Sequence, residues 1–362
     1  MKKSFEEVFE DQTKYGTKVK TEEYCISGAH IIVDQGQGQI AGYTDREDGL
    51  FADVPAIVFG DHTRVINYVA TPFYLGADGV KVLRSRFENA NYRYLYYALK
   101  SARIPNTGYN RHYKWLKETR INYPDAERQA EIVRILDRVM EVIGKRQQQL
   151  NAYDDLIKAR FVEMFGDLRI NKKGWGLRSF DDLTVLITDG EHATPKRTSE
   201  GIYLLSARNI LNHAIRLDDV DYIDQEEYDR IAKRVIPTEG DVLISCSGTV
   251  GRCCAVPADL KFQMVRSAAL LRFKPEIKPK FAEYMITSDF IQEQINQSKT
   301  ASSQANLFQG KIAKLKGFVP PIDMQEQFTD FISQVDKSKA EVQKSLDEAQ
   351  LLFDSLMQQY FG

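Results

Sequence analysis

The sequence predicts an α+β protein with two globular modules of mixed α and β structure and two long helices that form an antiparallel coiled coil. Three observations lead to this prediction. A segment that opens at residues 4–8 (SFEEV) and closes with FG at 165–166 is echoed by one that opens at 179–183 (SFDDL) and closes with FG at 361–362. Each half begins with a globular stretch. Each then ends in a long stretch of helical apolar periodicity, which is typical of a duplicated module.

In chain order, the first globular stretch predicts short strands at residues 29–34 and 56–59, where β-branched and aromatic residues lie between glycine-marked turns. A helix is predicted at residues 92–103. Apolar side chains recur along it at helical spacing, so we expect them to pack in the core rather than to bind a ligand. They are Tyr92, Leu95, Tyr96 and Leu99.

The first long helix is predicted after Pro124, because proline ends an extended segment and permits a helix to start. No proline follows within it. Its apolar seam advances by alternating steps of four and three residues, which is the heptad spacing of a coiled coil. The seam consists of Ile132, Leu136, Val139, Ile143, Arg146, Leu150, Tyr153, Ile157, Arg160 and Met164.

The second half repeats this order, with strands predicted at residues 201–205 and 241–245 and a helix at 281–297. A second long helix is predicted after Pro320 and Pro321. Although the order and type of elements match, most residues differ, which indicates two similar scaffolds with dissimilar loops. The second seam consists of Phe328, Ile332, Val335, Lys339, Val342, Leu346, Ala349, Phe353, Leu356 and Tyr360.

Each long helix would contain about 39 residues and extend ~58 Å, which is too long for an ordinary globular helix. We therefore expect the two seams to pair with each other, with polar positions in them fixing the register. The alternative is that each helix belongs to a separate, ordinary bundle.

Composition limits the remaining possibilities. The 362 residues suffice for two domains, and no apolar run approaches membrane-spanning length. The opening Met-Lys-Lys is not followed by an apolar signal region, so we expect a cytoplasmic protein. The four cysteines form no metal-binding spacing, and reduced, mostly buried thiols are the expectation.

Charge is unevenly distributed on a chain whose formal net charge is −2. Residues 81–120 contain ten Lys or Arg against two acidic residues, interleaved with tyrosines. Such a segment suits a surface that touches nucleic acid, and it equally suits a solvated helix whose tyrosines are core.

Polar loops rich in amides and cations recur at matching places in both modules. Arg bridges guanine, Asn and Gln bridge adenine, and Ser, Thr and Lys hold phosphates, although single residues of this kind are more often simple turn formers. The candidate DNA-binding residues of the first module are Gln35, Gln37, Gln39, Tyr43, His62, Thr63, Arg64, Asn110, Arg111, His112 and Lys114. Those of the second are His192, Thr194, Lys196, Arg197, Arg208, Asn209, Ser247, Thr249, Ser302, Ser303, Gln304 and Asn306.

Motifs of catalysis are missing from the sequence. Residues 248–252 (GTVGR) lack the lysine and spacing of a Walker loop, and residues 36–38 (GQG) do not lead into a helix. Residues 122–124 (NYP) are the nearest approach to an adenine-methyltransferase motif. We therefore predict no catalytic residue and no metal site in this chain.

These features resemble the DNA-specificity subunit of type I restriction-modification systems. The resemblance is carried in order by loops at 34–36, 60–63, 189–195, 240–244 and 248–251, and by helix starts at 124–129 (PDAERQ) and 320–327 (PPIDMQEQ). It implies a first target-recognition domain at 1–122, a central conserved helical spacer at 123–166, a second target-recognition domain at 167–318 and a C-terminal conserved spacer at 319–362.

The resemblance further implies that each recognition domain binds one part of a bipartite double-stranded DNA target. Two modification subunits carrying S-adenosylmethionine and restriction subunits using ATP and Mg²⁺ would dock on the scaffold. This chain would bind no cofactor itself and would be a non-catalytic part of an adenine-N6 methyltransferase and endonuclease complex. A coiled-coil adaptor that joins two proteins without reading DNA, and a stand-alone enzyme, are the competing hypotheses.

Overall fold

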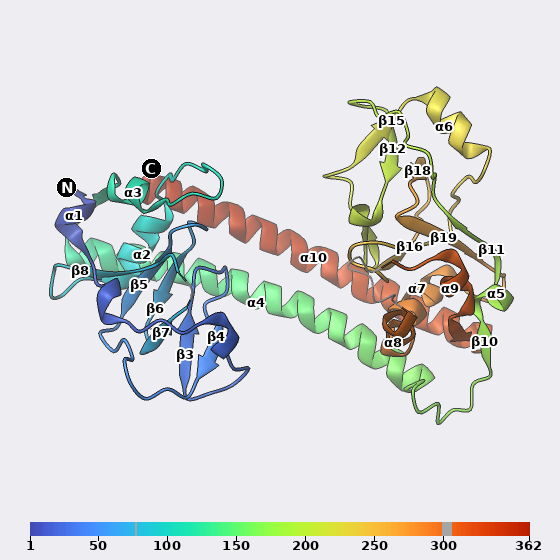
Figure 1. Cartoon of the computed structure of the whole chain (residues 1–362), viewed down its shortest axis with the longest axis horizontal. Coiled ribbons are helices and arrows are strands. Elements are labelled where there is room, and N and C mark those ends of the chain that lie inside the picture. The colour runs from blue at the N-terminus through green and yellow to red at the C-terminus, as the bar shows by residue number, and fades with distance from the viewer. Residues whose placement is uncertain (77, 299–305) are drawn as a thin grey trace. The chain divides into compact units, whose positions relative to one another are not determined.

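The computed structural model describes residues 1–76, 78–298 and 306–362 (Figure 1). The chain divides into two compact units. Unit 1 contains residues 1–148 and 343–362, and unit 2 contains residues 149–342. Each unit is described by itself below.

Unit 1 is built on two small sheets and a two-stranded ribbon. An antiparallel sheet has the order β2 (Phe9–Asp11), β8 (Val80–Ser85), β5 (Ala56–Gly60), β6 (Ile66–Val69). A second sheet has the order β4 (Gly42–Thr44), β3 (His30–Val33), β7 (Phe73–Leu75), with β3 and β7 parallel. The ribbon pairs β1 (Lys2–Ser4) with β9 (Arg120–Asn122). The short helices of unit 1 are α1 (Phe5–Val8), α2 (Tyr92–Lys100) and α3 (Tyr113–Lys117), with 3-10 turns at Thr13–Tyr15 and Thr21–Glu23.

Unit 2 repeats this topology. Its antiparallel sheet has the order β11 (Thr184–Asp189), β19 (Ala268–Phe273), β16 (Val242–Ser245), β17 (Cys253–Ala255), and its mixed sheet has the order β15 (Asp221–Ile223), β12 (Ile202–Leu205), β18 (Phe262–Met264). The ribbon pairs β10 (Leu177–Ser179) with β20 (Lys316–Phe318), and β13 (Ile210–Leu211) pairs with β14 (Ala214–Ile215). The helices are α5 (Phe180–Leu183), α6 (Gln225–Ala232), α7 (Pro279–Thr287), α8 (Asp289–Ser298), α9 (Gln309–Lys314) and a 3-10 turn at Ala207–Asn209.

The duplication predicted from residues 4–8 and 179–183 is confirmed at the level of hydrogen bonds. Ser4 and Ser179 each begin a one-turn helix with a capping box, in which the serine hydroxyl accepts from the backbone N–H three residues on. The acid at that third position, Glu7 or Asp182, accepts in return from the serine backbone N–H. The same local sequence therefore starts both units in the same way.

The strands alternate between two packed layers within each unit. In β5, Ile57 and Phe59 pack toward α2 and the long helices, whereas Ala56 and Val58 pack toward the second sheet. In β16, Ile244 faces the equivalent helical layer of unit 2. This alternation is the two-residue period of a strand that is buried on both faces.

The two long helices are α4 (Ala126–Phe165) and α10 (Ile322–Phe361). Both begin with the same hydrogen bond between a glutamine side chain and a proline carbonyl. Gln129, five residues after Pro124, donates its side-chain amide to the proline carbonyl at 2.9 Å, and Gln325 does the same to Pro320 at 2.9 Å. Both glutamines are buried. These bonds satisfy carbonyls that a helix start would otherwise leave to solvent.

The predicted antiparallel seam is confirmed within each unit. In unit 1 the start of α4 meets the end of α10, since the Arg128 guanidinium lies 5.5 Å from the Tyr360 ring, and Ile132 and Leu136 share a core with Phe353. In unit 2 the end of α4 meets the start of α10. There the Phe161 and Phe328 ring centroids are 5.5 Å apart, and Lys339 donates to Asp154 at 2.6 Å.

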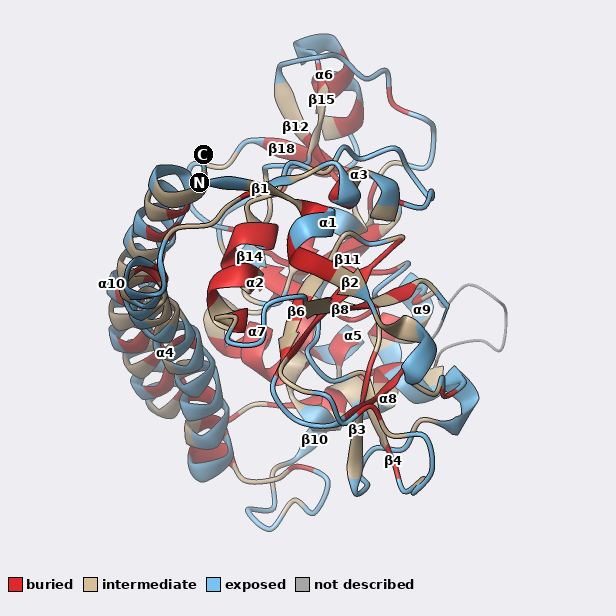
Figure 2. Cartoon of the chain, turned by 90° about the vertical axis from the view of Figure 1, so that its left-hand side faces the viewer, coloured by how far each residue is buried: buried red, intermediate tan, exposed pale blue. Residues whose placement is uncertain are grey.

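The core helices of the units are largely buried, whereas α4 and α10 carry long exposed faces (Figure 2). Tyr92, Leu95 and Leu99 of α2 are buried and Tyr96 packs beside them, as predicted. Two predicted helix bounds are wrong. The helix expected at 92–103 ends at Lys100, and the helix expected at 281–297 is two helices, α7 and α8. They are interrupted at Ser288, whose hydroxyl donates to the Met285 carbonyl and competes with the helical backbone bonds.

Candidate nucleic-acid interface

Three of the predicted loops of unit 1 converge. The Gln35 side chain donates to the Asp78 carbonyl at 3.0 Å and accepts from the His62 backbone N–H at 3.2 Å. The Thr63 hydroxyl donates to the Gln35 carbonyl at 2.6 Å. These residues therefore join the loop after β3 to the loop between β5 and β6, and they position the side chains around them.

His112 fastens the third loop, and its predicted role is corrected here. Its side chain is 0% exposed, and its Nδ1 and backbone N–H lie 2.9 Å and 2.8 Å from the Asp61 carbonyl. The Asp61 carboxylate in turn accepts from the Tyr113 backbone N–H at 2.6 Å. A fully buried ring does not reach a base, so His112 anchors the loop instead of contacting DNA.

The exposed surface over this cluster is aromatic and basic. The rings of His62 and Tyr109 stack at 4.7 Å and 8°, and Tyr109 is 88% exposed. Arg111, two residues after Tyr109, is also exposed. Arg64 adopts a left-handed backbone (φ 64°) and donates to the Ile104 carbonyl at 3.4 Å. Tyr109 was missing from the predicted set, although an aromatic residue after a glycine in a basic loop is a usable signal.

The other predicted residues of unit 1 lie on its loops, on β4 and on α3. Gln37 and Gln39 are exposed in the turn between β3 and β4, and Tyr43 is a half-buried residue of β4 whose backbone pairs with Cys25. Asn110 is exposed and its side-chain amide donates to the Thr107 carbonyl. Lys114 is exposed over the Trp115 ring.

In unit 2 two predicted arginines share one carboxylate. Arg197 Nε and an Arg208 terminal nitrogen each lie 2.9 Å from the carboxylate of Asp221. Partial burial raises the pKa of Asp221, but the hydrogen bond from Arg197 and the two positive charges outweigh it and hold the pKa below its usual value. Both guanidiniums are thus committed to an internal partner. Thr194 and Lys196 are exposed on the loop that leads into Arg197.

Asn209 is the second correction. It is 0% exposed, its carbonyl oxygen accepts from the Ser206 backbone N–H at 3.0 Å, and its amide donates to the carbonyls of Arg216 at 3.0 Å and Asp219 at 2.8 Å. All these bonds brace the loop from within. Asn209 is a structural residue rather than a contact for DNA.

Three predicted residues of unit 2 line a common hollow of about 350 Å³, namely His192, Ser247 and Asn306. The hollow is also lined by Asp189, Arg266 and Gln309, which the sequence analysis did not predict. These residues are far apart in the chain, and only the fold brings them together. Thr249 is exposed in the neighbouring turn. The predicted Ser302, Ser303 and Gln304 lie outside the described residues.

The family described as the type I restriction modification DNA specificity domain matches residues 2–152 and again residues 174–349. The chain belongs to that family. Its two matched segments begin just before the two capping boxes, so the duplication in the sequence is a duplication of the specificity domain.

Solved structures have the same fold. The type I restriction-modification S subunit of M. genitalium aligns with a TM-score of 0.55 at 14% identity, over 99% of this chain and 94% of that one. A structure from work on complex assembly and conformational transition of the type I R-M system aligns with a TM-score of 0.53 at 16% identity, over 100% of this chain and 97% of that one. A comparison with curated proteins finds no match.

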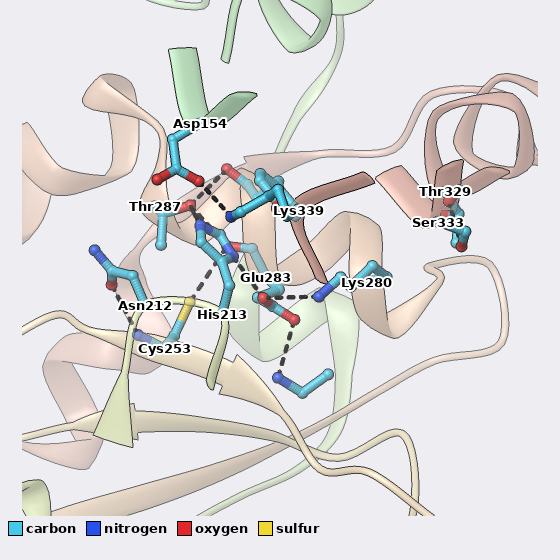
Figure 3. A network of polar contacts seen from close by, with 12 residues as sticks. Asp154, Asn212, His213, Cys253, Lys280, Glu283, Thr287, Thr329, Ser333 and Lys339 are labelled. Atoms are coloured by element: carbon cyan, nitrogen blue, oxygen red, sulfur yellow. Dashed lines mark hydrogen bonds and ion pairs between the residues drawn. The ribbon is translucent and has the colours of Figure 1, made fainter. Parts of the chain in front are cut away.

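Specificity subunits of this family are generally non-catalytic, and a second polar site in unit 2 fits a structural role. The Glu283 carboxylate is held by His213 at 2.5 Å, by Lys280 at 3.3 Å and by the Ala255 backbone N–H at 3.1 Å (Figure 3). These contacts pin the β13–β14 turn and β17 to α7. Burial raises the pKa of the neighbouring Cys253 thiol well above its usual value, which keeps it from acting as a nucleophile.

Among the residues that the structure describes, no three His, Cys, Asp or Glu side chains are arranged to hold a metal ion. None of their helices is both long and apolar enough to cross a bilayer.

Proposed function

We propose that this specificity subunit recognises a bipartite, asymmetric double-stranded DNA target, with one recognition module on each part. The observation that supports this proposal is the repeated topology with dissimilar loop clusters. The sheet order is the same in both units, yet unit 1 presents a stacked aromatic pair with arginines and unit 2 presents a polar hollow. Identical modules would favour a symmetric target, whereas different loops favour two different half-sites.

In this proposal the paired long helices set the number of unread base pairs between the half-sites, and they carry the partner subunits. Both helices keep apolar side chains on their exposed faces. These are Val142, Leu351 and Leu352 in unit 1, and Leu156 and Val162 in unit 2. Exposed apolar positions on a helix support docking of another protein. The partners are two modification subunits and the restriction subunits, acting in the cytoplasm where the host DNA lies.

The chemistry belongs to those partners. S-adenosylmethionine would bind in the modification subunit, which would take the target adenine out of the stack for N6 methylation, and ATP with Mg²⁺ would serve the restriction subunit. The role of this chain is to bind, orient and space.

The test is an exchange of one module. This chain is co-expressed with its modification subunit, and methyladenine is mapped genome-wide with and without replacement of residues 1–120 by those of a relative. We expect a gapped two-part motif in which the replacement alters one part. A change in both parts, or in neither, contradicts the two-module proposal.

The salt dependence of DNA affinity distinguishes this proposal from a coiled-coil adaptor that does not read DNA. DNA binding through phosphates releases counterions, so the affinity of the purified complex for DNA should fall steeply with salt concentration. A complex without salt-sensitive DNA affinity would favour the adaptor.

A further inference from the structure

Three of the loops that line the hollow in unit 2 are bonded to one another through the backbone. The Gly190 N–H donates to the Ala268 carbonyl at 3.0 Å, and the Arg266 N–H donates to the Glu191 carbonyl at 3.0 Å. The Cys246 N–H donates to the Ser267 carbonyl at 2.7 Å. Loops tied in this way hold their side chains in place before any ligand arrives, which lowers the entropic cost of binding.

The charges in the hollow are unequally satisfied. The Asp189 carboxylate is held on one oxygen by Arg234 at 2.5 Å and on the other by His192 at 2.8 Å. The Arg266 side chain is exposed, and among the described residues its guanidinium has no hydrogen bond or ion pair. Arg197 and Arg208, by contrast, are engaged by Asp221. Arg266 is therefore a cation whose donors remain available to a ligand.

The neighbouring carboxylate indicates what kind of ligand Arg266 would take. Arg234 and His192 are already bonded to Asp189, so a phosphate entering the hollow would find neither of these donors free. A guanine edge carries no net charge and presents two acceptors, N7 and O6, whose spacing matches the parallel N–H donors of a guanidinium. A carboxylate nearby is compatible with guanine, because the paired cytosine presents an amino donor.

We propose that Arg266 is a specificity-determining residue that reads a guanine in the half-site bound by unit 2. This inference rests on the proposed function and adds a residue and a base to it. It assigns Arg266 to direct base readout, and it assigns Asp189 to holding Arg234 and His192 in place.

The experiment uses the full chain in complex with its modification subunit and compares the wild type with Arg266→Ala and Arg266→Lys. The matched control is Arg178→Ala, which removes a half-buried arginine of unit 2 that pairs with Glu276 at 2.9 Å. Methyladenine motifs are mapped genome-wide, and binding is measured on duplexes that differ at single positions. Circular dichroism confirms that each variant folds.

We expect Arg266→Ala to lower discrimination for guanine roughly tenfold to a hundredfold at one position. That position should lie in the part of the motif that exchange of residues 1–120 leaves unchanged. Arg266→Lys should lose most of this discrimination because lysine lacks the paired donors, while it retains overall affinity. The control should keep the wild-type motif.

Two outcomes overturn the inference while the proposed function stands. One is a wild-type motif at every position in Arg266→Ala. The other is a uniform loss of affinity that Arg266→Lys restores, which would identify a phosphate contact. If the wild-type complex itself shows no two-part motif, the proposed function fails and the inference fails with it.

Discussion

Units 1 and 2 have the same sheet topology but hold their loops in different ways. In unit 1 the loops close around the buried His112 and leave the stacked His62 and Tyr109 on the surface. In unit 2 the loops surround a hollow that Arg266 helps to line. The difference teaches that the scaffold and the recognition surface are specified by separate sets of residues. Backbone hydrogen bonds between strands hold the sheets together, so the residues of the loops can differ without changing the sheet topology.

Cysteine placement gives the largest expected contrast between the units. Cys25 of unit 1 is exposed, whereas Cys246, Cys253 and Cys254 of unit 2 are buried. A buried thiol reacts only when the structure opens, and an opening that costs about 5 kcal/mol slows labelling by roughly a thousandfold or more. We expect one thiol to react rapidly with a thiol-specific reagent in the native protein and all four in urea. Cys25→Ser should abolish the rapid phase, and rapid labelling of two or more thiols would contradict the comparison.

The same thiols predict that unit 2 begins to lose stability at mildly alkaline pH. Burial raises the pKa of Cys246 and of Cys254 to about 12, with nearby carboxylates adding to the effect. Because these folded-state values lie above the unfolded value of about 8.5, the contribution to stability is complete below that pH. It is lost progressively as the pH rises toward about 12. Hydrogen exchange should show unit 2 loosening between pH 8.5 and 10, and uniform loosening of both units would contradict this.

The packing of α4 against α10 in unit 2 can be tested by truncating one buried ring. Phe161 lies within 5.0 to 6.4 Å of four other phenylalanine rings of unit 2, and Phe161→Ala should lower the free energy of unfolding by about 3–5 kcal/mol. The matched control is Val162→Ala. Val162 is 51% exposed, so its truncation should change stability by less than ~0.5 kcal/mol. Urea unfolding measures both, and equal effects would refute the seam in unit 2.

The glutamines at the starts of the two long helices differ in the number of backbone groups that they bond. Gln325 bonds to Pro320 and also donates to the Glu276 carbonyl and accepts from the Lys278 N–H, both at 2.9 Å, whereas the Gln129 amide donates to Pro124 alone among backbone carbonyls of the described residues. We expect Gln325→Ala to cost about 2–3 kcal/mol and Gln129→Ala about 1 kcal/mol, since each buried partner left unsatisfied adds to the loss. The urea midpoints of the two variants decide the order, and the reverse order would contradict it.

Arg111 of unit 1 should give the smallest effect. Its removal in Arg111→Ala should weaken DNA binding roughly fivefold to tenfold and reduce the salt slope by about one if it holds a phosphate. Arg138→Ala removes an exposed cation from α4 and serves as the control. An unchanged affinity would remove Arg111 from the interface, and a loss at a single base would assign it to readout.

Much of the fold was predictable because its signals are local. The strands at 30–33, 56–60, 202–205 and 242–245 match the predicted positions, since each stands between turn residues. The long helices follow from a seam whose period is set by the helix itself. The interruption at Ser288 was not predictable, because a serine hydroxyl competes with helical bonds at some positions and not at others.

The candidate site was less predictable than the fold. His112 and Asn209 have residue types suited to base contact, yet both are buried and bonded within their own units. Arg266 looks ordinary in the sequence, yet in the fold it lines the hollow with its side chain exposed. Whether a polar side chain braces a loop or faces outward depends on which distant loops meet it.

By itself the sequence determined the duplication, the helix starts and the antiparallel seam, because each depends on patterns that repeat along the chain. Only the tertiary structure decided which polar residues are buried, which arginines are already paired and where the hollow lies. Those properties arise from contacts between residues such as Asp189, Arg266 and Asn306, which are far apart in the chain. Burial and pairing are properties of the folded surroundings, and residue type alone does not encode them.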